Sequence, residues 1–455
     1  TPQLNVDGGM LSLSSTDPLV AGEAVSFGSG TISIAGDRTL TSNNPLHDRL
    51  MGNSVSNGQT FVVDGTLTLN TPYTVSGGTL SVGGLVNGFN LAFNGGMLEF
   101  SGGQLEVTDG AAFGDLLVLN SGKVISVTDA ASATIANDGY VSFTGSGRLS
   151  VDTTLVNNGE MVFSSAISRL MGSGTFTNNG LMQGTGRIEI ANVNNSAQGT
   201  IRVGSGQAMR FLTPVNNSGR IELQGASFET TMLNNASGSV LTMSGGATLR
   251  LNPNAASTNS GSMLISGNTD VYGDLTNNSD GVIRVGGGGV ASFFDDVVNS
   301  GNFEVAGGSA AVFFGTLDPG SIGGYGTIVI FGGLGSRIGQ SYIESDVTLG
   351  ESATTTMLIG TATEYSALTI GGEGQLAGTL IVTETGDRYL GAMYELITAD
   401  SLVGQFDNVI LPAAGMGMNY ELQYNGNSVF AVVVPEPATL SALAGLAALG
   451  LRRRR

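Results

Sequence analysis

A repeat of about twenty residues in the middle of the chain limits the folds that this sequence can adopt. Each copy contains asparagine or a polar relative, then a glycine, then a short segment in which apolar and polar residues alternate. Successive repeat glycines are 19 to 23 residues apart, and they are Gly139, Gly159, Gly180, Gly199, Gly219, Gly238, Gly261, Gly281 and Gly301. A repeat of this length is typical of a solenoid, in which each unit buries its apolar face only by stacking on its neighbours.

The segment after each glycine has the two-residue period of a β-strand. In Thr200–Val203 and in Arg220–Leu223 this alternation places the aliphatic side chains on one face and the charged ones on the other. Most units contain a second short apolar segment, such as residues 209–211. We therefore predict an all-β fold, a parallel β-helix or solenoid with about 20 residues per coil.

The occurrence of asparagine and glycine at the corners of the coils has a physical explanation. Glycine adopts positive φ freely, and asparagine tolerates the left-handed region while bonding its own backbone. Stacked asparagines can also form amide ladders between coils. If the coils stack in register, Arg202 lies beside Glu222, and Arg284 lies beside Glu304. Such exposed pairs select the register more than they stabilise the fold.

The strength of the repeat divides the chain into four parts. Residues 1–130 contain similar strands at looser spacing, which predicts irregular coils with an N-terminal cap. Residues 131–367 contain the regular coils. Residues 368–434 lose the repeat but keep strand patterns, so we expect a β-strand cap that protects the last open edge. Residues 435–455 form a separate tail with a short C-terminal apolar helix.

The composition excludes several classes of function. The chain has 36 acidic and 17 basic residues and a net charge of −19, so its surface repels nucleic acid and we expect no nucleic-acid partner. It contains no cysteine, which excludes disulfides, thiolate metal sites and a cysteine nucleophile. The chain starts at Thr1, which we interpret as numbering after removal of a signal peptide.

The tail has three parts in a fixed order, a proline-flanked glutamate, an apolar segment and a basic end. Its landmark residues are Pro435, Glu436, Pro437, Arg452, Arg453, Arg454 and Arg455. Residues 438–451 would make a helix of about 21 Å, shorter than the roughly 30 Å apolar core of a bilayer. The arginines would help such a short helix by reaching the cytoplasmic headgroups.

This tail resembles a PEP-CTERM sorting signal, a motif family also labelled the ice-binding protein C-terminal domain. The likeness covers about 22 residues, and residues 368–434 resemble the segment that precedes such tails in exported solenoids. The resemblance implies export in a Gram-negative cell, transient anchoring in the inner membrane, and cleavage near Pro-Glu-Pro by an exosortase-type protease. It further implies delivery to the cell surface or extracellular matrix, with exopolysaccharide or matrix proteins as partners.

Three aspartates raise the alternative of a glycan-active enzyme. Asp270, Asp295 and Asp296 resemble the acid cluster of polygalacturonase-like solenoids, where carboxylates act as general acid and base. That pattern also needs Gly-His-Gly and Arg-Ile-Lys, and neither occurs in this sequence. We therefore interpret these aspartates as residues of solvated turns and predict no catalytic residues.

Metal and cofactor binding have weak support in the sequence. The one histidine, His47, is expected in a surface loop, and a cysteine-free chain could offer a metal only carboxylates, which favours Ca²⁺. Asp274 and Asp280, with the aspartates at 295–296, are the residues that could bind it weakly. We predict no cofactor and no dedicated metal site.

An ice-binding face would need Thr-x-Thr in every coil, but pairs such as Thr66/Thr68 and Thr175/Thr177 are scattered. The sequence therefore favours a non-catalytic exported protein of the surface or matrix, structural or adhesive. A β-helix polysaccharide lyase or hydrolase remains the alternative.

Overall fold

The computed structural model describes most of the chain between residues 3 and 436. Within that span the residues not described are 7, 14–23, 37, 41–53, 70, 71, 83, 84, 94–96, 101–103, 114, 115, 120–123, 128–133, 138, 139, 144, 146, 152, 153, 336, 337 and 362. Repeat glycine Gly139, His47, Pro437 and Arg452–Arg455 lie outside the described residues.

The described residues form an all-β parallel solenoid of about 13 turns with about 21 residues per coil, and they contain no helix. The chain divides into two compact units, residues 1–241 and residues 242–455. The predicted parallel β-solenoid and the predicted length of its coil are thereby confirmed, and the C-terminal cap and apolar helix stay predictions.

The first unit contains strands β1 to β27, and β28 (Val240–Ser244) spans the division. They are β1 (Gln3–Val6), β2 (Gly9–Leu13), β3 (Ala24–Phe27), β4 (Gly30–Ile34), β5 (Arg38–Leu40), β6 (Ser54–Ser56), β7 (Gln59–Val63), β8 (Thr66–Leu69), β9 (Pro72–Ser76), β10 (Thr79–Val82), β11 (Leu85–Phe93), β12 (Met97–Phe100), β13 (Gln104–Phe113), β14 (Leu116–Leu119), β15 (Val124–Val127), β16 (Thr134–Asn137), β17 (Tyr140–Phe143), β18 (Arg148–Val151), β19 (Thr154–Asn157), β20 (Glu160–Asn178), β21 (Leu181–Asn195), β22 (Thr200–Val203), β23 (Ala208–Phe211), β24 (Val215–Asn217), β25 (Arg220–Gln224), β26 (Ser227–Glu229) and β27 (Leu233–Asn235).

The second unit contains strands β29 to β51. They are β29 (Thr248–Arg250), β30 (Ser257–Asn259), β31 (Ser262–Ser266), β32 (Thr269–Tyr272), β33 (Leu275–Asn277), β34 (Val282–Gly286), β35 (Val290–Phe293), β36 (Val297–Asn299), β37 (Asn302–Val305), β38 (Ala310–Phe313), β39 (Thr316–Asp318), β40 (Ser321–Gly323), β41 (Thr327–Ile330), β42 (Gly333–Gly335), β43 (Gly339–Ile343), β44 (Asp346–Leu349), β45 (Thr354–Ile359), β46 (Ser366–Leu376), β47 (Thr379–Glu384), β48 (Met393–Gly404), β49 (Asn408–Ile410), β50 (Met418–Asn425) and β51 (Ser428–Pro435).

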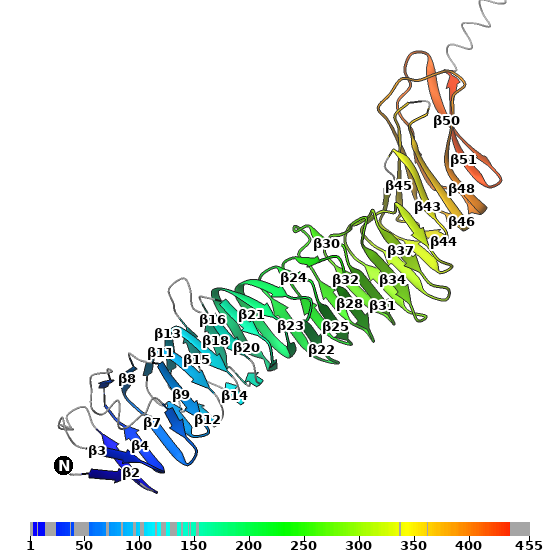
Figure 1. Cartoon of the computed structure of the whole chain (residues 1–455). Coiled ribbons are helices and arrows are strands. Elements are labelled where there is room, and N and C mark those ends of the chain that lie inside the picture. The colour runs from blue at the N-terminus through cyan, green and yellow to red at the C-terminus, as the bar shows by residue number, and fades with distance from the viewer. Residues whose placement is uncertain are drawn as a thin grey trace, which may run out of the picture. The chain divides into compact units, whose positions relative to one another are not determined.

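Three strands make each regular coil, and each strand pairs in parallel with its equivalent in the next coil. Within the first unit β22 pairs with β25, β23 with β26, and β24 with β27. Figure 1 shows β22 and β25 side by side. The register aligns Ile201 with Ile221 and Val203 with Leu223, and all four side chains are buried. Because identical faces stack on each other, alternation in the sequence becomes a continuous apolar core.

Buried asparagines form the amide ladders that the sequence predicted. In the first unit Asn178 Nδ2 donates to Asn195 Oδ1 at 2.8 Å, and Asn195 Nδ2 donates to Asn217 Oδ1 at 2.7 Å. Asn195 Nδ2 also donates to the carbonyl of Arg220 at 3.0 Å. The second unit has its own ladder, in which Asn277 Nδ2 donates to Asn299 Oδ1 at 2.8 Å. Each buried amide therefore joins one coil to the next through hydrogen bonds shielded from water.

The expected reason for the repeat glycines is wrong for all but one of those described. Among them only Gly238 has positive φ, at 82°. At Gly199 a Cβ atom would lie 2.1 Å from the carbonyl oxygen of Asn178 and 2.4 Å from Asn195 Oδ1. At Gly281 a Cβ atom would lie 2.2 Å from the carbonyl oxygen of Asn259. These glycines are needed because the neighbouring coil approaches too closely for a side chain, and not because of backbone twist.

Parallel pairing continues beyond residue 367, where the repeat weakens in the sequence. β48 pairs in parallel with β46, and β49 pairs in parallel with β47 as far as Ile410. β50 and β51 form an antiparallel hairpin, and β51 also pairs antiparallel with β48. The strands after residue 367 keep apolar alternation without the Asn-Gly corners, so coils can continue where the repeat is no longer visible.

Candidate functional site

Two of the predicted tail residues lie at the end of the last strand. Pro435 is the final residue of β51 and pairs with Met418 at the start of β50. Figure 1 shows β50 and β51 side by side. The N–H of Glu436 donates to the carbonyl oxygen of Gly417 at 2.9 Å. The first part of the predicted signal is thus attached to the last hairpin, and Pro437 and Arg452–Arg455 lie outside the described residues.

The sequence of β51 explains why the strand ends there. Val429, Ala431 and Val433 are buried, and the residues between them are partly exposed, which is the pattern of a strand with one face in the core. Pro435 has no N–H to continue the ladder, so proline is tolerated only at such an end.

A tight turn leads into β50, the strand that pairs with Pro435. Gly415 and Met418 exchange two backbone hydrogen bonds of 3.0 Å each. Between them Met416 has φ of 54° and Gly417 has φ of 73°. The Met416 side chain is 82% exposed, so packing does not account for this strained conformation. The turn instead sets the position of the Gly417 carbonyl that accepts from Glu436.

A charged cluster is enclosed between this turn and the preceding coil. Arg388 Nε lies 3.0 Å and 2.8 Å from the two carboxylate oxygens of Glu384, and both side chains are largely buried. The Tyr420 hydroxyl donates to Glu384 Oε1 at 2.7 Å. Arg388 Nη1 donates to the carbonyl of Met418 at 3.3 Å. The cluster was not predictable from the sequence, because none of its residues belongs to a repeat.

The cluster changes the acidity of its tyrosines. Burial raises the pKa of Tyr420, and the hydrogen bond and negative charge of Glu384 raise it further. Burial also raises the pKa of Tyr394, with a second contribution from the charge of Glu384. Both phenols therefore strongly prefer their neutral form in the folded protein.

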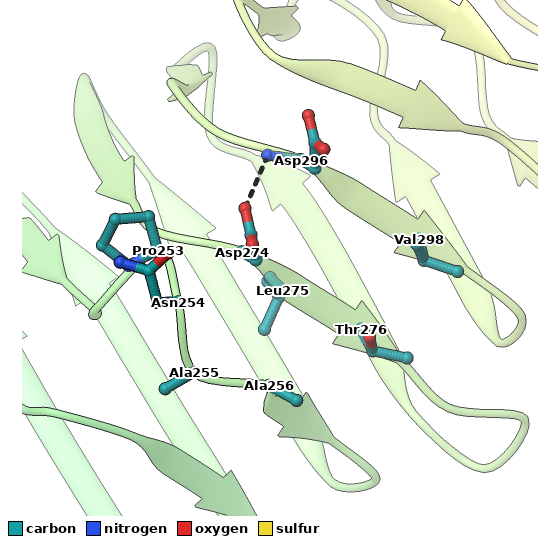
Figure 2. A pocket seen from close by; sticks show the side chains of 9 residues that line it. All are labelled: Pro253, Asn254, Ala255, Ala256, Asp274, Leu275, Thr276, Asp296 and Val298. Atoms are coloured by element: carbon teal, nitrogen blue, oxygen red, sulfur yellow. Dashed lines mark hydrogen bonds between the residues drawn. The ribbon is translucent and has the colours of Figure 1, made fainter.

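Two of the aspartates noted in the sequence analysis line a surface groove in the second unit. The groove has a volume of about 430 Å³ and is drawn in Figure 2. It is lined by Pro253, Asn254, Ala255, Ala256, Asp274, Leu275, Thr276, Asp296 and Val298. Asp274 Oδ1 accepts from the N–H of Asp296 at 3.2 Å, and Asp296 Oδ1 accepts from the N–H of Thr316 at 2.7 Å. Each carboxylate therefore uses one oxygen to accept a hydrogen bond from a backbone N–H of the next coil.

The structure does not place Asp270 opposite the other two candidate acids. Asp270 pairs with Ser292, three residues before Asp295. Asp295 Oδ2 instead accepts from the N–H of Gly273 at 2.7 Å. Three residues of strand separate aligned positions by about 10 Å. Asp295 and Asp296 lie in the turn between β35 and β36, and each accepts a hydrogen bond there from a backbone N–H of another coil.

Metal ligands are not gathered in the part of the chain that the structure describes. No three acidic or histidine side chains there lie close enough together to hold an ion. Asp280 is exposed and contacts the hydroxyl of Ser279 at 3.4 Å, away from the groove lining. In the same described residues no helix is both long and apolar enough to cross a bilayer.

An outward column of aromatic rings, also missed in the sequence analysis, crosses four coils of the second unit. Tyr272 stacks on Phe294 at 4.3 Å between ring centroids, Phe294 on Phe314 at 5.0 Å, and Phe314 on Phe331 at 5.4 Å. The guanidinium of Arg250 lies 4.2 Å from the Tyr272 ring and covers that end. The spacing of about one aromatic residue per coil would have been the signal. Because the rings stack face to face, mainly their edges are exposed to solvent.

No family model matches this chain, and no curated protein matches it.

Proposed function

We propose that this protein is a non-catalytic, exported component of the cell surface or extracellular matrix, with a structural or adhesive role. The observation that carries the proposal is the ladder of buried asparagines. Asn157, Asn178 and Asn195 each bond an asparagine of the next coil, so the interior is used to lock neighbouring coils together. Such an interior suits a stiff scaffold that presents a repetitive surface.

The proposed sorting signal is the tail from Pro435 to Arg455, recognised by an exosortase-type protease after transient anchoring in the inner membrane. Its support is the position of Pro435 at the end of β51, the last described strand. β51 ends at Pro435, so cleavage near residues 435–437 removes no strand of the solenoid. The mature protein would keep all the described strands after release to the surface or matrix.

Mass spectrometry of the carboxyl terminus, on protein recovered from the native cell surface and medium, tests this proposal. A terminus between Pro435 and Pro437 supports processing and places the solenoid outside the cell. An intact Arg455 in the membrane fraction contradicts release, because the chain would then remain anchored by its tail.

Exopolysaccharide or neighbouring matrix proteins are the proposed ligands. Several outward arginines of the coils pair with glutamates, as Arg202 does with Glu222 at 2.8 Å and Arg284 with Glu304 at 3.4 Å. The excess negative charge is therefore carried by acids without such partners, which favours neutral or cationic ligands. Retention of purified protein on neutral and amino-bearing polysaccharides, with no release of sugar, is the expected result.

A glycan-active enzyme is the second candidate, and the groove is the observation that favours it. Asp274 and Asp296 lie in adjacent coils at its wall, and each uses one carboxylate oxygen in a turn. Turnover of a polysaccharide by the purified protein, lost in Asp296→Asn or Asp295→Asn, would establish this candidate. Equal turnover by the wild type and both variants would point to a contaminating enzyme.

A further inference from the structure

The bond between Pro435 and Glu436 is part of the folded ladder. Pro435 pairs with Met418, and the Glu436 N–H is bonded to the Gly417 carbonyl. On the other edge of β51, Gly391 N–H donates to the Val433 carbonyl at 2.9 Å. β51 is therefore held from both sides almost to its end, and its last two residues are held by β50.

A protease binds the main chain of an extended segment, so groups already bonded in a ladder must first be released. The rate of cleavage is then limited by the fraction of molecules in which this segment is released from the ladder. For this site the relevant opening is separation of residues 435–436 from the Gly415–Met418 turn.

Arg388 links this turn to the buried cluster. It donates to the carbonyl of Met418, the partner of Pro435, and its charge is neutralised by Glu384 in a largely buried pair. Opening the hairpin end breaks the Met418 contact and exposes the ion pair. In Arg388→Met the bond to Met418 is absent from the closed hairpin and Glu384 is left enclosed without its partner, which destabilises the closed form.

We infer that the folded hairpin shields the Pro435–Glu436 bond, and that Arg388, held by Glu384, sets how often this site opens. The inference rests on the proposed function, because it assigns a regulation to the proposed processing site. Arg388 is a positioning residue that acts through Met418. Processing then occurs before the hairpin closes or during its rare openings.

Hydrogen–deuterium exchange on the full-length protein measures the opening directly. Prolines at 435 and 437 carry no N–H, so in a proteolytic fragment covering residues 434–437 the deuterium retained on the backbone reports Glu436. In the wild type we expect this amide to exchange at least about 100-fold more slowly than in an unstructured peptide. In Arg388→Met we expect exchange at least about tenfold faster than in the wild type.

The matched control is Arg202→Met, which removes an exposed arginine from a pair with Glu222 in the first unit. It should leave exchange at Glu436 unchanged. If Arg388→Met does not fold, Tyr420→Phe removes one hydrogen bond to Glu384 and keeps the ring, and a smaller acceleration of about threefold is expected. Exchange at Glu436 as fast as in an unstructured peptide, or equal in wild type and in the folded cluster variants, would overturn the inference.

Processing in cells separates this inference from the proposed function. If carboxyl termini at residues 435–437 appear faster in Arg388→Met than in Arg202→Met, the result agrees with both the inference and the proposed function. If no such ends form in any variant, the proposed function fails and the exchange result still decides whether the bond is shielded. If ends form at equal rates although exchange differs, the cluster controls opening but not processing, and the regulatory inference is overturned.

Discussion

The buried asparagine ladder of the coils and the buried ion pair at the last hairpin solve the same problem in different ways. Both enclose polar groups that need partners. Asn195 is neutral and repeats the contacts of the rungs before and after it, whereas Arg388 is charged and joins groups that occur once. The comparison teaches that repeated polar burial fixes the register of a stack, and single polar burial fixes how a particular end is arranged.

The energetic consequences of the two arrangements also differ. A fully bonded neutral amide loses little on burial, but each partner left without a bond costs about 1–3 kcal/mol. A buried ion pair contributes little net stability, yet removing one partner costs about 3–5 kcal/mol. In the ladder the polar groups that depend on partners are distributed over many coils. In the hairpin they are concentrated in Glu384 and Arg388.

Breaking one rung of the ladder should have the largest effect. Asn195→Leu keeps the branching of the side chain but removes the acceptor of Asn178 and the donor to Asn217 and Arg220. We expect a loss of about 4–5 kcal/mol in the free energy of unfolding, measured by urea denaturation. The control Asn194→Leu, in the partly exposed outer row, should cost less than about 1 kcal/mol. Equal losses would show that the buried ladder has no special role.

Neutralising the ion pair should rank second. Glu384→Gln keeps the shape but leaves the Arg388 charge enclosed, and we expect a loss of about 3 kcal/mol confined to the hairpin. Hydrogen exchange of β50 and β51 measures it. Glu222→Gln in the exposed pair with Arg202 is the matched control, with an expected loss below about 0.5 kcal/mol. A large effect of the control would contradict the distinction drawn between buried and exposed pairs.

Alkaline pH should weaken the hairpin next, without a change to the sequence. The pKa of Tyr420 is raised in the fold by burial and by Glu384, so the folded state holds its proton longer than the unfolded state does. The contribution of protonated Tyr420 to the free energy of unfolding is complete below the unfolded pKa of about 10. It is lost as pH rises above that value, by up to about 1.4 kcal/mol per pH unit. Tyr420→Phe should flatten this dependence, and the remaining slope reports Tyr394 and Tyr424, whose pKa values burial also raises. The same slope in the variant would exclude a contribution from Tyr420.

Relieving the strained turn should give the smallest effect and the opposite sign. Met416 has positive φ and an exposed side chain, so Met416→Gly should stabilise the hairpin by about 1 kcal/mol. The reverse change at its neighbour, Gly417→Ala, should destabilise it by a similar amount. Differential scanning calorimetry of both variants decides, and a destabilising Met416→Gly would mean that the Met416 side chain makes contacts that offset the strain.

The coils and their register were predictable because they depend on local patterns that recur. Alternation in each strand and constant spacing of the corners together predict that Arg202 aligns with Glu222 and Arg284 with Glu304, and both alignments are present. The role of the repeat glycines was not predictable in the same way. The atom that would lie nearest to a Cβ at Gly199 is the carbonyl oxygen of Asn178, which comes close only when coils stack.

The sequence by itself determined the repeat, the inward and outward faces of the strands, and the motif at Pro435–Pro437, because each is written in adjacent or evenly spaced residues. Only the tertiary structure decided that Pro435 pairs with Met418, and that Glu384, Arg388 and Tyr420 meet beside that pair. The physical reason is the absence of a period. Glu384 and Tyr420 are 36 residues apart in a contact that occurs once, and the chain must turn back as an antiparallel hairpin before they can touch.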